Sequence, residues 1–359
     1  MKIAVISHSH YPIQEPFAGG LEAHTSSLTR QLQRAGHHVT LYSAVGTDET
    51  LPFVPFFRPT EVGLFKSDAN IADYREERYT ALMQLLQHSD YDLIHNNSLN
   101  YIPLQMAGSL PMPMVTVLHT PPFPSLVEGF RASLAAQNHH VIGVSKTVVR
   151  AWQREIPELN VTLVYNGVDT TIWLPLRQQA RHAIWFGRIT PEKGTHLAIQ
   201  AARLANVQLK ICGPIHDSDY FAEQIEPWLG QDVAYLGSLN TVTLADEVAR
   251  ASVFICTPCW DEPFGLVAAE ALASGTPVAG FRRGALSEIL TPETGVLVAQ
   301  NDVEGLAKAI PQAQQLCPQA CRRRATELFS VDTMLRNYTH LYQRLVGDRI
   351  SVSALSSAP

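Results

Sequence analysis

The sequence has no long apolar run and little cysteine, and each absence excludes a class of protein. No apolar stretch approaches the ~20 residues of a membrane-spanning helix, and the opening stretch Met1–Ser7 is too short for a signal peptide. The five cysteines are odd in number, so a disulfide framework is not expected. We therefore expect a cytoplasmic protein without an integral membrane segment, while a peripheral membrane contact stays open.

The cysteines include two closely spaced pairs. Cys256 and Cys259 form C-x-x-C, and Cys317 and Cys321 form C-x-x-x-C. A zinc site is the weaker alternative when the pairs are weighed against the usual ligand patterns of zinc. Cys256 lies in an apolar run, so packing is the simpler explanation.

The charge pattern also excludes function classes. The net charge is −6 and 17% of the residues are charged, with no basic stripe that would indicate a nucleic-acid partner. The dense basic run Arg322–Arg324 is expected to form a solvated helix face. The chain lacks G-x-G-x-x-G and G-x-x-x-x-G-K-[ST], which disfavours Rossmann dehydrogenases and P-loop proteins.

Apolar strand-like runs alternate with helical stretches along the chain, which is typical of doubly wound parallel sheets. One alternation runs from Lys2–Ser7 to Thr162–Tyr165, and a second begins at Ala183–Gly187. The 359 residues suffice for two domains. The sequence predicts α/β domains at 1–168 and 169–331, a linker over 170–181, long loops at 46–73 and 121–131, and a disordered tail at 351–359.

A strand-to-helix unit carries two glutamates eight residues apart. An apolar run leads into Asp261–Leu266, and an Ala- and Leu-rich stretch follows. Pro263 suits the first turn of a helix and Gly275 the position just past its end. The pattern predicts Glu262 at the helix start and Glu270 about two turns along, roughly 9–12 Å away. That separation matches a nucleotide sugar from hexose to ribose, and the helix N-terminus between the glutamates suits a diphosphate.

These residues resemble the E-x7-E signature of retaining glycosyltransferases, in the form found in glycosyltransferase family 4. The alternative is an ordinary strand–turn–helix unit with two surface glutamates, but the surrounding runs Asp-Glu-Pro-Phe-Gly-Leu and Ala-Ser-Gly-Thr-Pro-Val favour the resemblance. The resemblance implies the GT-B fold, with two facing Rossmann-like domains, an interdomain cleft, and a C-terminal helix at about 332–346 that packs back on the first domain. It also implies that Glu262 contacts the donor sugar, that Glu270 holds the ribose hydroxyls, and that the amides of Phe264, Gly265 and Leu266 bind the diphosphate.

The segment Gly187–Gly194 follows the first strand of the second half. Its two cations, Arg188 and Lys193, can together neutralise a diphosphate, although an exposed loop with scattered cations is the alternative. The segment resembles the G-R-[LI]-x-x-x-K-G motif of the family. The resemblance implies that both cations bind the donor pyrophosphate and stabilise the negative charge that develops as the glycosidic bond breaks.

Three residues of the first half complete the expected site. Gly19 and Gly20 stand before the first helix, where backbone N–H groups suit an anion, and they resemble the family's G-G-x-E, whose glycine backbone meets the diphosphate. His119 ends a strand and resembles the family's histidine near the reacting centre. Many relatives have His-Asp where this chain has His-Thr, so any role of that acid is absent or filled elsewhere.

Other histidines stand near these residues. His24 is expected to be a surface residue. His8 and His10 lie in the loop after the first strand, and one of them is expected to touch the acceptor.

Weaker signals mark the base, the hinge and a metal motif. Gly213, Ser238 and Leu239 are expected to contact the nucleotide base, and the turn at 166–169 resembles the family's N-G-V-D hinge. Asp217–Asp219 has the D-x-D form that binds a metal in a different glycosyltransferase fold. Such a triplet arises easily by chance, and the cations and a helix N-terminus already supply positive charge, so no metal or other cofactor is expected.

The sequence therefore predicts a retaining glycosyltransferase that moves a hexose from a nucleoside-diphosphate sugar, with UDP-glucose favoured, to a hydroxyl acceptor. Many relatives that act on lipid acceptors carry a basic amphipathic face near the N-terminus. None is seen in this sequence, which favours a soluble small molecule or glycan as acceptor. The alternatives are a nucleotide-sugar epimerase or phosphorylase on the same fold, or an inactive nucleotide-sugar-binding protein. The four charged residues Arg188, Lys193, Glu262 and Glu270 argue against the inactive protein.

Overall fold

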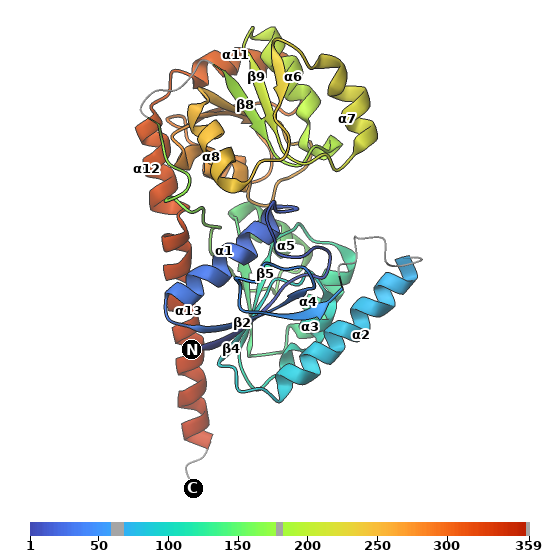
Figure 1. Ribbon diagram of the computed structural model, residues 1–359. Coiled ribbons are helices and arrows are strands. Elements are labelled where there is room, and N and C mark those ends of the chain that lie inside the picture. Colours follow the sequence, from blue (N-terminus) through green and yellow to red (C-terminus); the bar gives the residue numbers. More distant parts are fainter. Residues whose placement is uncertain (59–67, 177–181, 357–359) are drawn as a thin grey trace. The chain divides into compact units, whose positions relative to one another are not determined.

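The computed structural model describes residues 1–58, 68–176 and 182–356, which form two compact units (Figure 1). Unit 1 contains residues 1–164 and the chain from Met334 onward, and unit 2 contains Tyr165–Thr333. The expected boundaries after 168 and 331 both fall inside unit 2. The first boundary lies before Val168 rather than after it, because Val168 pairs with Ser330 of unit 2 as an isolated parallel bridge. The two ends of unit 2 are thereby held together.

Unit 1 is built on a seven-stranded parallel sheet in the order β3-β2-β1-β4-β5-β6-β7. The strands are β1 (Lys2–Ile6), β2 (His38–Ala44), β3 (Phe53–Phe57), β4 (Leu93–Asn96), β5 (Met114–Leu118), β6 (His139–Gly143) and β7 (Val161–Leu163). The helices are α1 (Gly20–Arg34), α2 (Asp68–Gln87), α3 (Tyr101–Met106), η1 (Ala107–Ser109), α4 (Pro124–Ser133), α5 (Lys146–Glu155) and most of α13 (Val331–Ser356). Strands β4 and β5 are buried along their whole length, as expected for parallel strands covered on both faces.

Unit 2 is built on a six-stranded parallel sheet in the order β10-β9-β8-β11-β12-β13. The strands are β8 (Ala183–Phe186), β9 (Leu209–Cys212), β10 (Val233–Tyr235), β11 (Val253–Cys256), β12 (Val278–Phe281) and β13 (Gly295–Val298). The helices are η2 (Pro191–Lys193), α6 (Thr195–Leu204), α7 (Ser218–Gln224), η3 (Glu226–Trp228), α8 (Thr241–Arg250), α9 (Leu266–Ala273), α10 (Leu286–Ile289), α11 (Val303–Ala313) and α12 (Pro318–Leu328). Part of its core consists of small alanines of α6 and α11 packed on the large apolar side chains of the strands.

Two segments expected to be loops contain regular structure. β3 lies within the expected loop 46–73, whose residues 59–67 are outside the described part of the chain. Its Pro55 is tolerated because β3 is an edge strand. Helix α4 begins within the expected loop 121–131 and continues to Ser133. Its Gly129 allows close packing on α3, since a Cβ there would lie 3.1 Å from Tyr101 Cα. Both segments were missed because proline and glycine are ordinarily loop signals.

Helix α13 runs from Val331 to Ser356, well beyond the expected end near 346 and into the expected disordered tail. No proline interrupts the chain from Val331 to Ser356, and residues 357–359 lie outside the described chain. From Met334 onward the helix belongs to unit 1, where Tyr338 and Tyr342 are fully buried. None of the described helices is long and apolar enough to cross a membrane.

The basic run on α12 is not the solvated face that the sequence predicts. The Arg322 guanidinium donates to the carbonyls of Trp173, Ala273 and Thr170, the last two at 2.7 Å. Ala273 is the last residue of α9, so the cation satisfies a carbonyl that has no partner within its helix. Arg324 donates in the same way to the carbonyls that end α10. Only Arg323 of the three is exposed.

This arrangement predicts unequal effects of two substitutions on the same helix. Arg322→Ala leaves three carbonyls without their donor, so the free energy of unfolding of unit 2 is expected to fall by about 2–4 kcal/mol. Arg323→Ala removes the same charge from the exposed side and should change it by less than about 0.5 kcal/mol. Urea unfolding followed by tryptophan fluorescence measures both, since four of the five tryptophans lie in unit 2. Equal midpoints for the two variants would contradict the role of Arg322.

Candidate functional site

The predicted charged motifs of unit 2 meet where its strand order reverses. From β8 the chain builds the sheet outward through β9 and β10, and it then returns to add β11 on the other side of β8. Ligands of doubly wound sheets bind at the carboxyl ends of the strands beside such a switch point. The loop after β8 carries Arg188 and Lys193, and the loop after β11 carries Glu262.

Lys193 and Glu262 form an ion pair at this point. Lys193 Nζ contacts Glu262 Oε1, and Trp260 Nε1 donates to the same oxygen at 2.8 Å. The ammonium also lies 5.2 Å from the centre of the Trp260 ring. The side chains of Lys193 and Glu262 are only 20% and 12% exposed. Because an ammonium has three N–H donors, Lys193 can hold Glu262 and a phosphate at the same time.

The turn that carries Lys193 is locked onto the end of β11. Thr257 Oγ1 donates to the carbonyl of Gly194 at 2.9 Å, and the N–H of Cys259 donates to the carbonyl of Glu192 at 2.7 Å. Gly194 has a φ of +66°, and a Cβ there would lie 2.2 Å from the Thr257 carbonyl oxygen. The position of Lys193 relative to the loop that carries Glu262 is therefore fixed by these hydrogen bonds and by the close approach at Gly194.

The loop after β12 holds Glu262 from another direction. The N–H of Ala285 donates to the Glu262 carbonyl at 3.0 Å, and Arg283 Nε donates to Asp261 Oδ1 at 3.3 Å. Gly284 has a φ of +53°, and a Cβ there would lie 2.4 Å from both the nitrogen and the carbonyl oxygen of Glu262. The sequence motifs did not single out this loop, although a glycine directly after a buried strand and two arginines was an available signal.

Helix α9 begins later than the sequence predicts. Gly265, with a φ of +89°, is the N-cap, and Leu266 is the first helical residue. Pro263 thus lies before the helix, because the left-handed Gly265 turns the chain between them. Glu270 is the fifth residue of α9, little more than one turn along, so the estimate of 9–12 Å between the glutamates, which assumed a continuous helix, does not apply. Gly265 has no side chain to cap the helix, and the N–H of Ala268 already donates to the Gly265 carbonyl at 3.0 Å. The N–H groups of Leu266 and Val267, for which the described residues supply no acceptor, are the ones that a ligand can use.

Phe264 contributes to this turn as an anchor. Its side chain is 3% exposed, and its ring centre lies 6.1 Å from that of Tyr165 and 5.7 Å from that of Phe329. The side chain therefore faces the interior of unit 2, and only the main chain of Phe264 is available to a ligand.

The Glu270 carboxyl has a pKa above the ordinary value of a glutamate. Burial raises its pKa to about 8, with no compensating hydrogen bond or charge among the described residues. The residue keeps some solvent exposure, and the shift favours the protonated form of the free carboxyl. A ligand whose hydroxyls donate to the carboxylate favours the ionised form and lowers this pKa. Binding of such a ligand should thus release a proton.

Arg188 stands at a close crossing of two strand ends. It follows Gly187, and a Cβ on Gly213 would lie 1.8 Å from the Gly187 carbonyl oxygen. Arg188 is partly exposed, and none of the described residues forms an ion pair with it. Gly213 follows β9, and the other two residues expected near the base, Ser238 and Leu239, follow β10, the next strand outward.

The D-x-D triplet has a structural role. The Asp217 side chain is the N-cap of α7 and accepts from the N–H of Tyr220 at 2.8 Å. All five cysteines are free thiols. No group of three or more His, Cys, Asp or Glu side chains within the described ranges could hold a metal ion.

In unit 1, the expected glycines begin the first helix. Gly19 is the N-cap of α1 in extended conformation, Gly20 is its first residue, and no side chain caps the helix. Glu22 is buried, with Oε1 2.8 Å from His8 Nε2. The N–H of His10 donates to His8 Nδ1 at 3.1 Å. The loop after β1 is therefore ordered by one of the two histidines that were expected near the acceptor.

His119 directly follows β5 and contacts two polar residues, Asn97 and His24, that were not expected in the site. Its Nε2 is 2.8 Å from Asn97 Oδ1, and its ring centre is 4.9 Å from that of His24. The prediction that His24 is a surface residue is wrong, since its side chain is 2% exposed. Burial lowers the pKa of His24 to about 4 and that of His119 well below its usual range, so both rings are neutral near pH 7.

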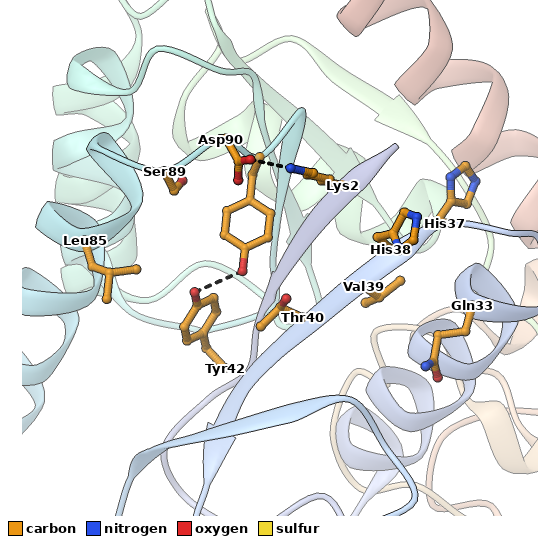
Figure 2. Close-up of a pocket in the computed structure, with 11 residues that line it drawn as sticks. Lys2, Gln33, His37, His38, Val39, Thr40, Tyr42, Leu85, Ser89 and Asp90 are labelled. Carbon is orange, nitrogen blue, oxygen red and sulfur yellow. Dashed lines mark hydrogen bonds and ion pairs between the residues drawn. The ribbon is translucent and has the colours of Figure 1, made fainter.

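The predicted site residues thus form one group in each unit. Gly19, Gly20 and His119 lie at the carboxyl end of the sheet of unit 1, and the others lie at that end of the sheet of unit 2. A cavity of about 680 Å³ opens at the opposite, amino-terminal edge of the unit 1 sheet (Figure 2). Lys2, His38 and Asp90 are among the residues that line it, and none of the predicted site residues does.

Comparison with known proteins finds a matching family model for each unit. Residues 18–172 match the family model described as Glycosyltransferase Family 4, and residues 174–324 match the model described as Glycosyl transferases group 1. A phosphatidyl-myo-inositol mannosyltransferase of Mycolicibacterium smegmatis is 27% identical over 315 residues, which cover 81% of this chain and 80% of that protein.

Two solved structures share the fold. Sucrose-phosphate synthase from Thermosynechococcus elongatus has a TM-score of 0.79 at 21% identity, covering 97% of this chain and 99% of that one. Anabaena HepE, in complex with UDP-glucose, has a TM-score of 0.74 at 21% identity, covering 96% and 100%. The two matched models account for most of the sequence, and they confirm the resemblance seen in its motifs. The chain belongs to glycosyltransferase family 4 and is a glycosyltransferase of the GT-B fold.

Proposed function

We propose that this glycosyltransferase moves a hexose, with retention of configuration, from a nucleoside-diphosphate sugar to a hydroxyl of a soluble small molecule or glycan. The observation that carries the proposal is the Lys193–Glu262 ion pair at the switch point of unit 2. In a nucleotide sugar the phosphate is bonded directly to the sugar. A cation for the phosphate and a carboxylate for the sugar must therefore be neighbours, as these two side chains are.

Each part of the donor has a proposed partner in unit 2. Arg188, Lys193 and the main-chain N–H groups of Phe264, Gly265 and Leu266 at the start of α9 bind the diphosphate. Glu262 accepts hydrogen bonds from the sugar, and Glu270 accepts them from the ribose. Gly213, Ser238 and Leu239 contact the base through the ends of β9 and β10. Because the residues assigned to the diphosphate already supply positive charge, we propose that no metal is required.

The proposed chemistry is a displacement on one face of the sugar. The acceptor hydroxyl oxygen forms a bond to the anomeric carbon as the bond from that carbon to the phosphate oxygen breaks. The hydroxyl proton passes to the departing phosphate oxygen. Arg188 and Lys193 stabilise the charge on that phosphate, which supplies the main electrostatic contribution to the rate. We assign His119 to the donor sugar near the reacting centre, which is the role that the family resemblance implies.

The donor and acceptor are proposed with support from the comparisons. The HepE structure is a complex with UDP-glucose, which supports a UDP-glucose donor. The mycobacterial relative is named a phosphatidyl-myo-inositol mannosyltransferase, so a donor panel should include mannose and an acceptor panel a lipid. A soluble acceptor and a cytoplasmic location stay predictions from the sequence.

Arg188→Ala is expected to lower sugar transfer by about 100-fold or more, because it removes a donor to the charge that develops on the leaving phosphate. Incubation with radiolabelled UDP-, GDP- and ADP-sugars, with water or candidate hydroxyl compounds as acceptor, measures the rate. Arg203→Ala is the matched control, since Arg203 stacks on Trp228 at 4.5 Å and is exposed on α6.

Equal rates for Arg188→Ala and Arg203→Ala would contradict the assignment of Arg188. Wild-type protein that binds a nucleotide sugar but never releases free sugar or transfers it would instead indicate a binding protein. Conversion of the donor to another nucleotide sugar would indicate an epimerase.

The raised pKa of Glu270 predicts how nucleotide affinity changes with pH. The free carboxyl has a pKa of about 8, and the ribose hydroxyls should lower it in the complex. Affinity is then weakest at low pH and rises with pH until about pH 8, by up to about tenfold per unit. Calorimetric titration of wild type with UDP across this range measures the trend.

The control for this titration is Glu270→Gln, which keeps the shape of a protonated glutamate but cannot ionise. UDP affinity of the variant should match that of wild type at low pH and fall behind it as the pH rises towards about 8. Because ionisation of UDP itself affects both proteins equally, only their difference is interpreted. An identical pH dependence in the two proteins would show that Glu270 does not ionise on binding.

A further inference from the structure

A chain of polar side chains links the C-terminal helix to His119 within unit 1. Tyr342 Oη lies 2.5 Å from His95 Nδ1, and His95 Nε2 lies 3.1 Å from Asn97 Oδ1. The same Asn97 oxygen lies 2.8 Å from His119 Nε2. Tyr342, His95 and Asn97 are fully buried. None of them was singled out by the sequence motifs.

The donors in this chain can be assigned from Asn97. Its Nδ2 donates to Thr25 Oγ1 at 3.3 Å, which leaves Oδ1 to accept from the histidines. An amide oxygen only accepts, so the Nε2 atoms of both His95 and His119 must carry protons. His95 Nδ1 is then the acceptor for the hydroxyl of Tyr342. In a neutral ring, protonation of His119 at Nε2 leaves its Nδ1 as an acceptor.

Asn97 is itself held firmly. Its N–H donates to the carbonyl of Ile6 at 2.8 Å, which continues the pairing of β4 with β1. The residues on both sides of Asn97 form local hydrogen bonds from main chain to side chain. Asn96 Oδ1 accepts from the N–H of Ser98 at 3.1 Å, and Ser98 Oγ accepts from the N–H of Asn100 at 3.2 Å. Leu99 between them has a φ of +52°. A bulky residue in this conformation is strained and persists only where its surroundings determine it.

The main chain beside His119 is fixed as well. Trp152 is fully buried, and its Nε1 donates to the carbonyl of Thr120 at 2.9 Å. The imidazole of His119 is thus bounded by a fixed main chain, the ring of His24 and the Asn97 amide. Among the described residues, Asn97 is the only one whose side chain forms a hydrogen bond with the His119 ring.

We infer that Asn97 is a positioning residue that holds His119 in the neutral tautomer with its proton on Nε2, so that Nδ1 accepts a hydrogen bond from a substrate hydroxyl. The inference rests on the proposed function, in which His119 contacts the donor sugar near the reacting centre. His95 and Tyr342 extend the same assignment, because the Tyr342 hydroxyl keeps the His95 proton on the nitrogen that faces Asn97. His119 Nδ1 therefore accepts a hydrogen bond from a substrate hydroxyl. A substrate oxygen without a proton is disfavoured there, because it has no hydrogen to donate.

The kinetic test compares two substitutions of buried or half-buried asparagines in unit 1. Asn97→Ala frees the His119 ring and its tautomer, and kcat is expected to fall on the order of 10- to 100-fold. UDP affinity should change less than about twofold, because Asn97 and His119 are assigned to the sugar and not to the nucleotide. Asn138→Ala is the control, since the partners of Asn138 Nδ2 among the described residues are main-chain carbonyls, including that of Leu110 at 2.8 Å. A loss of kcat in Asn97→Ala no greater than in Asn138→Ala would overturn the inference.

The tautomer can be measured without any substrate. In histidine-labelled wild-type protein, the nitrogen chemical shifts of His119, assigned with a His119→Gln variant, are expected to show a protonated Nε2 and an unprotonated Nδ1. In Asn97→Ala the two tautomers should mix, whereas in Asn138→Ala the spectrum should match that of wild type. A proton on Nδ1 in wild type would overturn the inference.

The two readouts separate this inference from the proposed function. If wild type transfers no sugar but His119 has the expected tautomer that depends on Asn97, the proposed function fails and the positioning role stands. If transfer occurs but the tautomer is reversed or indifferent to Asn97, the positioning role fails and the function stands.

Discussion

Close contact between main chains is the constraint on which the candidate site depends. At three places in unit 2 a glycine lies against the backbone of another loop, so closely that a Cβ would fall within 2.4 Å of a backbone atom: Gly194 on Thr257, Gly213 on Gly187, and Gly284 on Glu262. No side chain fits at these contacts. They draw the loops after β8, β9, β11 and β12 together, and the ion pair of Lys193 with Glu262 follows from that approach.

The two units have different side chains at equivalent places in their sheets. In each sheet the first strand lies beside the fourth, which creates a switch point at the carboxyl ends of β1 and β4 in unit 1 and of β8 and β11 in unit 2. Unit 2 lines its switch point with charged residues and uncapped amides, which suit a diphosphate. Unit 1 lines its own with Asn97 and with histidines such as His24 and His95, which burial keeps neutral by lowering their pKa values. Neutral donors and acceptors of this kind suit hydroxyl groups.

The alternating apolar runs and the charged motifs were sufficient to predict two parallel α/β units and a family 4 glycosyltransferase, because strand burial and motif spacing are local properties. Features that depend on packing were not predictable in this way. Strand β3 and helix α4 carry prolines and a glycine that only their neighbours make acceptable. From the sequence alone, Arg322 was predicted to be an exposed cation. Its hydrogen bonds to the carbonyls of Trp173 and Ala273 depend on how α12 packs. The contacts of His24 and Asn97 with His119 were not predictable from the sequence, because they depend on β1, β4 and β5 lying side by side in one sheet.

The carboxyl edge of the unit 2 sheet is central to the proposed function, because it is where the nucleotide sugar should bind. Hydrogen exchange followed by mass spectrometry, with and without UDP-glucose, tests this most directly because it locates the ligand on the main chain. We expect slower exchange at 187–194 and 262–268 when the donor is present. Protection confined to the cavity at the amino-terminal edge of unit 1, around 33–42 and 85–91, with none at 187–194, would contradict it.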